Sequence, residues 1–271
     1  MENKSVNRLD DQCIRFDWAI RQLLREEANF GVLEGFLTVF LGEKITLLEI
    51  PENEDNPLPP GERLNRIVIK ARNSRDKTIL IEIQNLRKLH YFERLLYGVP
   101  NALPRGEACR DVKKIYSISI LYFDIGKGND YLYYGRNDLT GAHTGDLLEL
   151  TIKEKSVIVT PKPVDAVREY VLIRLNAFEQ NAVTPLEEWM TYLKTGIIRF
   201  GTTAPGLGEA RGKLSYFAMT TPERRAYDEY LSAIMIQNDV LDTARLEGRI
   251  LGKNEAKTAL QKHEGTSKCT V

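Results

Sequence analysis

One acidic and one amide side chain interrupt an otherwise apolar run. Residues 79–84 alternate isoleucine with Leu80, Glu82 and Gln84, and alternate residues of a β-strand point to opposite faces of a sheet. Glu82 and Gln84 then share one face, while the isoleucines of the other face are typical of a buried core. A carboxylate in such a run is costly unless it pairs with a cation, accepts hydrogen bonds or binds a metal ion. We expect any chemistry to be centred on Glu82; pairing with an arginine of the following helix is the structural alternative.

The segment before this strand predicts its antiparallel partner. Residues 66–72 alternate and a polar turn follows, so the two strands are expected to form a hairpin. Counting back from the turn places Val68 opposite Glu82, with Lys70 two residues further along the same face. An acidic residue at position 68 would share a divalent cation with Glu82, because Mg²⁺ is bound by one or two carboxylates together with water and phosphate. The sequence has valine there.

Patterns on both sides of the hairpin predict an α/β fold. Apolar residues at helical spacing predict helices over Phe16–Ala28, Phe30–Leu41 and Leu89–Leu103. Asn29 is a candidate N-cap of the second helix and Gly42 its candidate end. Apolar runs predict further strands over Ile45–Ile50, Ile115–Phe123, Tyr131–Tyr134, Leu147–Ile152, Val157–Thr160 and Tyr170–Leu175.

The C-terminal third has a helical pattern. Thr184 followed by Pro185 and Glu187 is the signature of a capped helix start, and predicts a helix to Lys194. Further helices are expected over Leu207–Met219, over Pro222–Asn238 with Thr221 as its cap, and over Asp239–His263. The predicted organisation is an α/β core over residues 1–180, a helical region over 181–263 and a disordered tail over 264–271.

Composition narrows the class of protein. Lys+Arg and Asp+Glu both number 38, whereas a protein that coats nucleic acid non-specifically is usually basic, so DNA binding would need a local basic patch. Three scattered cysteines without metal-ligand spacing favour a reducing cytoplasm. The polar first eleven residues lack the apolar core of a signal peptide. No apolar run approaches the roughly 20 residues of a membrane span.

The order of several segments resembles a known family. The hairpin and the segment after it are similar to the PD-(D/E)XK nuclease family transposases, which are related to recombination-promoting nucleases. The matching segments are Arg66–Asn73, Ile79–Gln84, Tyr91–Gly98, Phe16–Ile20, Lys114–Ile118, His143–Asp146 and Thr184–Trp189. The resemblance extends over nearly the whole chain, to about Tyr230.

The resemblance implies a restriction-endonuclease-like mixed β-sheet flanked by helices, and Mg²⁺- or Mn²⁺-dependent cleavage of DNA phosphodiesters. In the family pattern, an Asp on the first hairpin strand and the Glu of an E-x-Q or E-x-K motif bind the metal, and the last residue of that motif orients or activates the attacking water. Glu82 and Gln84 match this motif, and Glu34 matches an acidic residue that some members place near the metal. The family Asp aligns with Val68, which cannot bind a metal ion. The resemblance therefore implies a weakened or inactive site.

Three substitutes for the missing carboxylate stay open. Glu34 could serve as the second ligand, Glu62 could enter from the preceding loop, or Lys70 could supply positive charge to the phosphate without a metal ion. The simplest alternative is loss of activity, because removing one of two acidic ligands lowers both metal affinity and the rate of phosphoryl transfer.

The expected partner is DNA. Arg66, Arg72 and Arg94 are the candidate DNA contacts in a locally basic hairpin region, with pairing to Glu82 as the structural alternative for Arg94. The sequence thus predicts either a nuclease with reduced activity or a DNA- or protein-binding module that keeps the fold. The C-terminal helices are candidates for homo-oligomer formation.

Overall fold

The computed structural model describes residues 12–50, 66–74, 78–85, 115–125, 127–136, 153–154, 157–158, 169–179 and 183–266. The chain divides into two compact units, Met1–Ala218 and Met219–Val271, and each is described by itself. Two predicted elements, the helix over Leu89–Leu103 and the strand over Leu147–Ile152, lie outside the described residues.

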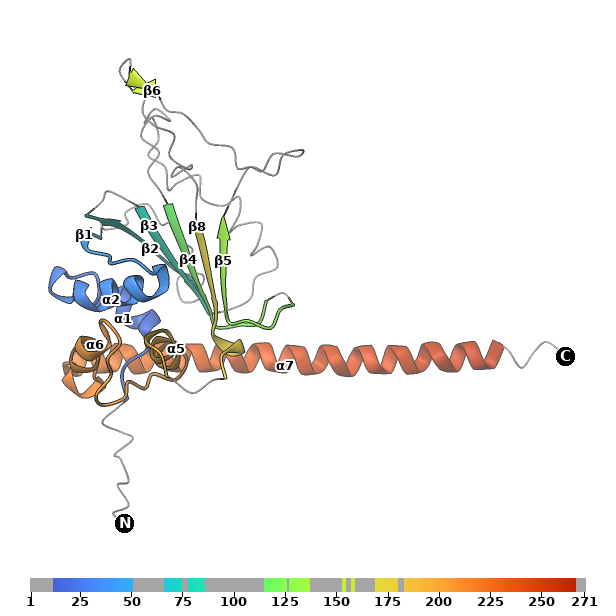
Figure 1. The fold of residues 1–271 in the computed structure, drawn as a ribbon. Helices are drawn as coiled ribbons and strands as arrows, with labels where there is room; N and C mark the ends of the chain where they lie inside the picture. The colour runs from blue at the N-terminus through green and yellow to red at the C-terminus, as the bar shows by residue number, and fades with distance from the viewer. Residues whose placement is uncertain are drawn as a thin grey trace, which may run out of the picture. The chain divides into compact units, whose positions relative to one another are not determined.

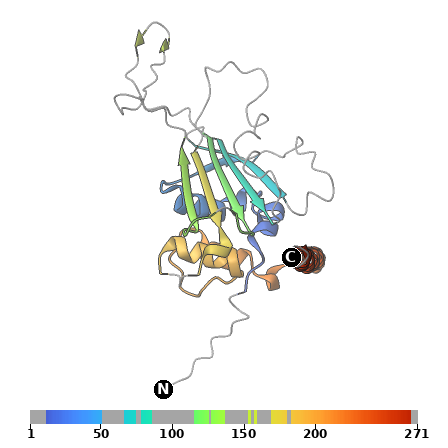
Figure 2. The same cartoon turned by 90° about the vertical axis from the view of Figure 1, so that its right-hand side faces the viewer.

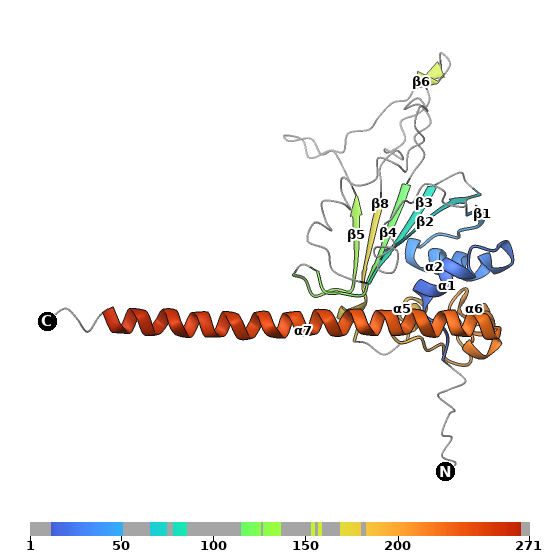
Figure 3. The same cartoon turned by 180° about the vertical axis from the view of Figure 1, so that it is seen from behind.

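A six-stranded mixed sheet organises the first unit (Figures 1, 2 and 3), and it confirms the predicted α/β class. Its order is β1-β2-β3-β4-β8-β5, in which β3, β4 and β8 are parallel and the remaining pairs are antiparallel. The strands are β1 Leu47–Glu49, β2 Arg66–Asn73, β3 Thr78–Gln84, β4 Ile115–Leu121, β5 Leu132–Arg136 and β8 Glu169–Arg174. Two short strands, β6 Lys153–Glu154 and β7 Val157–Ile158, pair separately.

Strand alternation gives the sheet two chemically different faces. The isoleucine face carries side chains that are at most 2% exposed, namely Ile69, Ile79, Ile81, Ile83, Ile118, Ile120, Val171 and Ile173. The opposite face, here called the Glu82 face, carries Leu80, Glu82, Gln84, Ser117, Ser119, Leu121, Tyr170, Leu172 and Arg174. Tyr134, in register with Val171, donates a hydrogen bond to the Phe40 carbonyl at 3.0 Å. The helix that contains Phe40 therefore covers the isoleucine face.

Four aromatic rings join three helices into the core beside this face. The helices are α1 Phe16–Gln22, α2 Phe30–Leu41 and α5 Pro185–Thr195. The ring of Phe16 lies 5.1 Å from Phe36 and 5.9 Å from Trp189, and Phe36 lies 4.6 Å from Phe40. Trp189 also donates to the Pro205 carbonyl at 2.9 Å. Since burying each large aromatic contributes a few kcal/mol, this cluster is a main source of the unit's stability.

Local signals set most helix ends, with two corrections. α2 ends as predicted at Gly42, whose φ of 68° is left-handed, and α5 begins with the predicted capping box of Thr184 and Glu187. α1 ends at Gln22, earlier than predicted, and is followed by a 3-10 turn over Glu27–Asn29. Asn29 does not cap α2. Its backbone (ψ of 0°) lacks the extended conformation of an N-cap, and its side chain donates to the Leu23 carbonyl at 2.7 Å.

The helix after α5 is also shorter than predicted. α6 spans Leu207–Lys213, and a 3-10 turn follows over Tyr216–Ala218. The backbone between them pairs with the N-terminal segment instead. The Ile14 N–H donates to the Leu214 carbonyl at 2.8 Å, and Cys13 and Ser215 form an isolated antiparallel β-bridge through their backbones. Tertiary pairing therefore ends this helix.

The second unit is built on one long helix, α7 Thr221–Thr266. The predicted charged continuation is thus helical. Its cap is Thr220 rather than the predicted Thr221, because the Glu223 N–H donates to Thr220 Oγ1 at 3.4 Å and the Thr220 N–H donates to Glu223 Oε2 at 2.7 Å. Within the described part of the chain, no helix is both long and apolar enough to span a membrane.

Candidate functional site on the Glu82 face

Glu82 stands in the middle of the sheet, between an antiparallel and a parallel neighbour. The hairpin register predicted from the turn is confirmed: Val68 of β2 lies opposite Glu82, and Lys70 lies opposite Leu80. On the other side, Ser119 of β4 stands beside Glu82. A valine and a serine position therefore flank the carboxylate.

The surroundings of Glu82 are mainly apolar but not closed. Glu82 itself is partly exposed, less buried than its apolar run suggested, whereas Gln84 is fully buried. Leu80 packs with Ile115 on the same face, and a second cluster around Leu121 lies further along the strands. A partly exposed carboxylate between apolar clusters can accept a proton or hydrogen bonds, or bind a cation.

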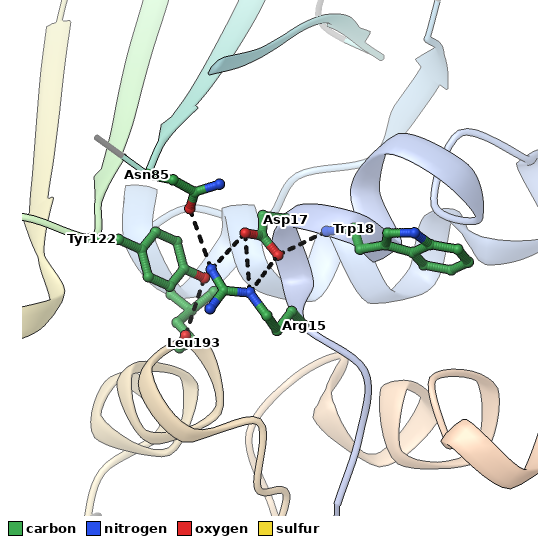
Figure 4. A network of polar contacts seen from close by, with 6 residues as sticks. All are labelled: Arg15, Asp17, Trp18, Asn85, Tyr122 and Leu193. Carbon is green, nitrogen blue, oxygen red and sulfur yellow. Dashed lines mark hydrogen bonds and ion pairs between the residues drawn. The ribbon is translucent and has the colours of Figure 1, made fainter. Parts of the chain in front are cut away.

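A polar network anchors the end of β3 on the opposite face (Figure 4). Because Asn85 directly follows Gln84, the two side chains point to opposite sides of the sheet. Asn85 Oδ1 accepts a hydrogen bond from Arg15 Nη2 at 3.2 Å. The Arg15 guanidinium also lies over the ring of Tyr122, the residue after β4, at 4.5 Å. Arg15 thus connects the ends of the two strands that carry Glu82 and Ser119.

The partner of this arginine is Asp17, whose side chain is 0% exposed. Its carboxylate accepts from Arg15 Nη2 at 2.6 Å and Nε at 3.0 Å, and from the Trp18 N–H at 2.9 Å. Tyr122 completes the network by donating to the Leu193 carbonyl of α5 at 3.1 Å. The opening segment Phe16–Ile20 therefore has a structural role: Phe16 fills the core, and Asp17 fixes the arginine that holds β3.

The other acidic candidate, Glu34, has a defined structural contact. Its Oε1 accepts a hydrogen bond from the Leu47 N–H at 2.7 Å, at the start of β1. Glu34 therefore orders the edge strand, and its role as a second metal ligand stays a prediction.

The candidate DNA contacts lie in different settings. Arg72 forms an exposed ion pair with Glu49, with 2.9 Å between Nη2 and Oε1. Arg66 and Lys70 lie in β2, where the structure describes their backbone, and Arg94 lies outside the described residues. Their contacts with DNA or phosphate stay predictions.

Two residues of the Glu82 face that were not among the sequence candidates carry a buried polar atom without a hydrogen bond. Ser119 is 1% exposed, and its hydroxyl has no hydrogen-bond partner among the described residues. Arg174 is 8% exposed, and its Nε has no partner in the same part of the chain. Serines at alternate positions 117 and 119 of an apolar strand were a usable signal for Ser119. No local pattern marks Arg174, because only the pairing of β4 with β8 brings it to this face.

Comparison with known proteins assigns the fold to a family. The profile of the PD-(D/E)XK nuclease family transposases matches residues 14–155, which include the Arg15–Asp17 network, the hairpin and β4. The chain belongs to this family. No curated protein matches the chain, and no solved structure does. The six-stranded mixed sheet with flanking helices is consistent with the restriction-endonuclease-like fold of PD-(D/E)XK proteins.

PD-(D/E)XK nucleases generally use divalent metal ions, so the donor set around Glu82 is a direct test of such a site. Among the described residues, no group of three His, Cys, Asp or Glu is placed to hold a metal ion. At the centre of the described sheet stands one carboxylate, Glu82, with valine at the position opposite it. Since Mg²⁺ is usually bound by one or two carboxylates together with water and phosphate, Glu82 would leave most of the ion's ligands to water and phosphate, which fits a weakly held cation.

Proposed function

We propose that this PD-(D/E)XK family protein binds DNA through its Glu82 face and cleaves phosphodiesters weakly or not at all. The observation that carries the proposal is the register of Val68 opposite Glu82. Nuclease chemistry of this type needs cationic stabilisation of the phosphate, and an aliphatic side chain cannot provide a ligand. A family fold with one of two acidic positions lost retains DNA binding more readily than cleavage.

The test restores the missing carboxylate. Val68→Asp is compared with Val68→Asn, which has the same shape but no charge, in nicking assays on supercoiled DNA with Mg²⁺ or Mn²⁺. Nicking by Val68→Asp alone, abolished by adding Glu82→Ala, supports the proposal. Rapid cleavage by the unchanged protein that is lost in Glu82→Ala would contradict it.

A live nuclease with a rearranged site is the second candidate. In this arrangement Glu34 takes the place of the missing carboxylate, and cutting depends on Mn²⁺. Glu34→Ala should then abolish cutting as fully as Glu82→Ala does. Because Glu34 also accepts the Leu47 N–H, melting temperatures must show that the variant remains folded. Cutting that survives Glu34→Ala excludes this ligand.

A binding module without chemistry is the related alternative. It predicts a salt-dependent shift of DNA without cleavage under any metal condition, because phosphate contacts release counterions. If no DNA is bound at low salt, the Glu82 face would serve a protein partner instead.

We also propose that the protein forms homo-oligomers through α7. Several apolar residues on this helix are at least half exposed, namely Met235, Ile236, Val240, Leu246, Ile250 and Leu251. A helix of this length with exposed apolar residues is best stabilised by a partner helix. Light scattering of the full chain against Val240→Asp tests this: a monomer at all concentrations would refute it. Cys13 is buried and forms no disulfide, which supports the proposal of a reducing compartment such as the cytoplasm.

A further inference from the structure

Two buried polar atoms on the Glu82 face lack the partners that buried polar atoms normally have. These are the Ser119 hydroxyl and the Arg174 Nε. Nearly all buried polar groups in native proteins are hydrogen-bonded, and an unsatisfied one is destabilising. Each such exception calls for an explanation, and a bound ion or a functional role is one.

The geometry of Arg174 leaves one edge of its guanidinium available. Its Nη1 donates to the carbonyls of Gly128 and Asp130, at 3.0 Å each, and to Tyr133 Oη at 3.4 Å. These contacts fix the plane of the group from one side. The edge formed by Nε and Nη2 is the one that binds carboxylate or phosphate in a two-pronged manner. Among the described residues, Arg174 forms no ion pair, so no described carboxylate balances this buried cation.

The sheet register brings both groups to the same side as Glu82. Ser119 is beside Glu82, one strand spacing or about 4.8 Å away. Arg174 is in register with Leu121, which is in register with Gln84, so Arg174 stands about 10 Å from Gln84 across two strands. Glu82, which borders the buried Ser119, is partly exposed, so solvent reaches this face next to the serine.

We propose that the Ser119 hydroxyl and the free edge of Arg174 bind non-bridging phosphate oxygens of a DNA strand that lies across the Glu82 face. This inference rests on the proposed DNA binding and adds the residues that hold the backbone. A hydroxyl and a guanidinium edge can both donate hydrogen bonds. A phosphodiester offers two non-bridging oxygens that accept them. Arg174 also offsets the repulsion between Glu82 and the phosphate. No metal ion is needed for this contact.

The decisive variant is Ser119→Ala, because stability and binding should move in opposite directions. Removing a buried hydroxyl without a partner should leave the melting temperature unchanged or raise it by about 2–4 °C. Loss of a hydrogen bond to a charged oxygen should weaken DNA affinity by about tenfold or more. Arg174→Lys keeps the charge but lacks the two-pronged edge, and should also weaken binding by about tenfold. Arg211→Lys is the matched control, because Arg211 stacks on Phe200, 5.3 Å from the ring centroid, in α6.

Affinities are measured by fluorescence anisotropy with a labelled duplex at several salt concentrations, and melting temperatures by scanning fluorimetry of the full chain. Unchanged affinity in both Ser119→Ala and Arg174→Lys overturns the proposal, as does a lower melting temperature of Ser119→Ala. If Arg174→Lys does not fold, Ser119→Ala decides alone. If the unchanged protein binds no DNA, the proposed function fails, and inorganic phosphate then tests the anion site. Phosphate that raises the melting temperature of the unchanged protein but not of Ser119→Ala supports the site, and no such effect overturns it.

Discussion

The ion pair of Arg15 and Asp17 should respond asymmetrically to truncation. Asp17→Ala leaves a guanidinium whose side chain is 29% exposed and that keeps Asn85 Oδ1 and the Tyr122 ring as neighbours. Arg15→Ala leaves a carboxylate that is 0% exposed, with the Trp18 N–H as its remaining hydrogen bond in this network. Breaking a buried pair costs about 3–5 kcal/mol. We expect the loss near 3 kcal/mol for Asp17→Ala, and near 5 kcal/mol for Arg15→Ala, because the buried carboxylate cannot turn toward water.

Urea unfolding followed by tryptophan fluorescence measures these losses. The chain has two tryptophans, and Trp18 and Trp189 are 5% and 0% exposed in the first unit, so the signal reports the relevant core. The double variant Arg15→Met with Asp17→Leu should lose several kcal/mol less than the sum of the single losses, because neither residue then leaves an unpaired charge. Arg72→Met is the matched control. It breaks an ion pair whose side chains are about half exposed and should cost less than about 1 kcal/mol.

Equal losses from the two single truncations, or single losses that add in the double variant, would refute this reasoning. Equal losses would mean that the burial of Asp17 does not make its unpaired charge the costlier one, and additive losses would mean that the two residues are not coupled. Loss of DNA binding together with stability would further show that the network holds β3 in place for the Glu82 face.

Further predictions concern packing, helix capping and pH. Gly35→Ala should lower the free energy of unfolding by about 1–3 kcal/mol, because its Cβ would lie 2.4 Å from the backbone of residues 205–206. Gly208→Ala is the control within a helix, because its Cβ would meet nothing within 4 Å. In thermal melts it should raise the free energy of unfolding by about 0.5–1 kcal/mol. Thr184→Ala should cost about 1 kcal/mol through loss of the α5 cap. Hydrogen bonds from the Thr184 and Val183 N–H groups lower the pKa of Glu187 below its ordinary value. The cap therefore contributes most to stability above the unfolded-state pKa of Glu187, and this contribution should be lost as the pH falls through the lowered pKa. Glu187→Gln should remove that pH dependence of the melting temperature. An unchanged dependence of melting temperature on pH would contradict the assignment.

The hairpin at the centre of the site could be predicted because its information is local. Alternation of apolar and polar residues determines which side chains share a face, and a short turn then determines the register. This was enough to place Val68 opposite Glu82 before the fold was known. The same holds for the α5 capping box and for the left-handed end of α2 at Gly42, since each depends on residues within one helical turn.

The ends of other helices could not be predicted from neighbouring residues, because they depend on contacts with other parts of the chain. Asn29 is a residue type favoured at N-caps, but the tight turn before α2 gives its backbone a conformation unsuited to capping. Its side chain donates to the Leu23 carbonyl instead. α6 ends early because residues near 214 pair with the N-terminal segment. Neither outcome has a signal in a short window of sequence.

By itself, the sequence determined that one carboxylate, Glu82, stands at the centre of a sheet without an acidic residue across the hairpin. Only the tertiary structure decided what else surrounds it. Parallel pairing of β3, β4 and β8 joins strands separated by long stretches of chain, and no periodicity encodes which distant strands become neighbours. That pairing brings Ser119 and Arg174 to the Glu82 face, while the arginine network on the opposite face holds the strand ends that carry it.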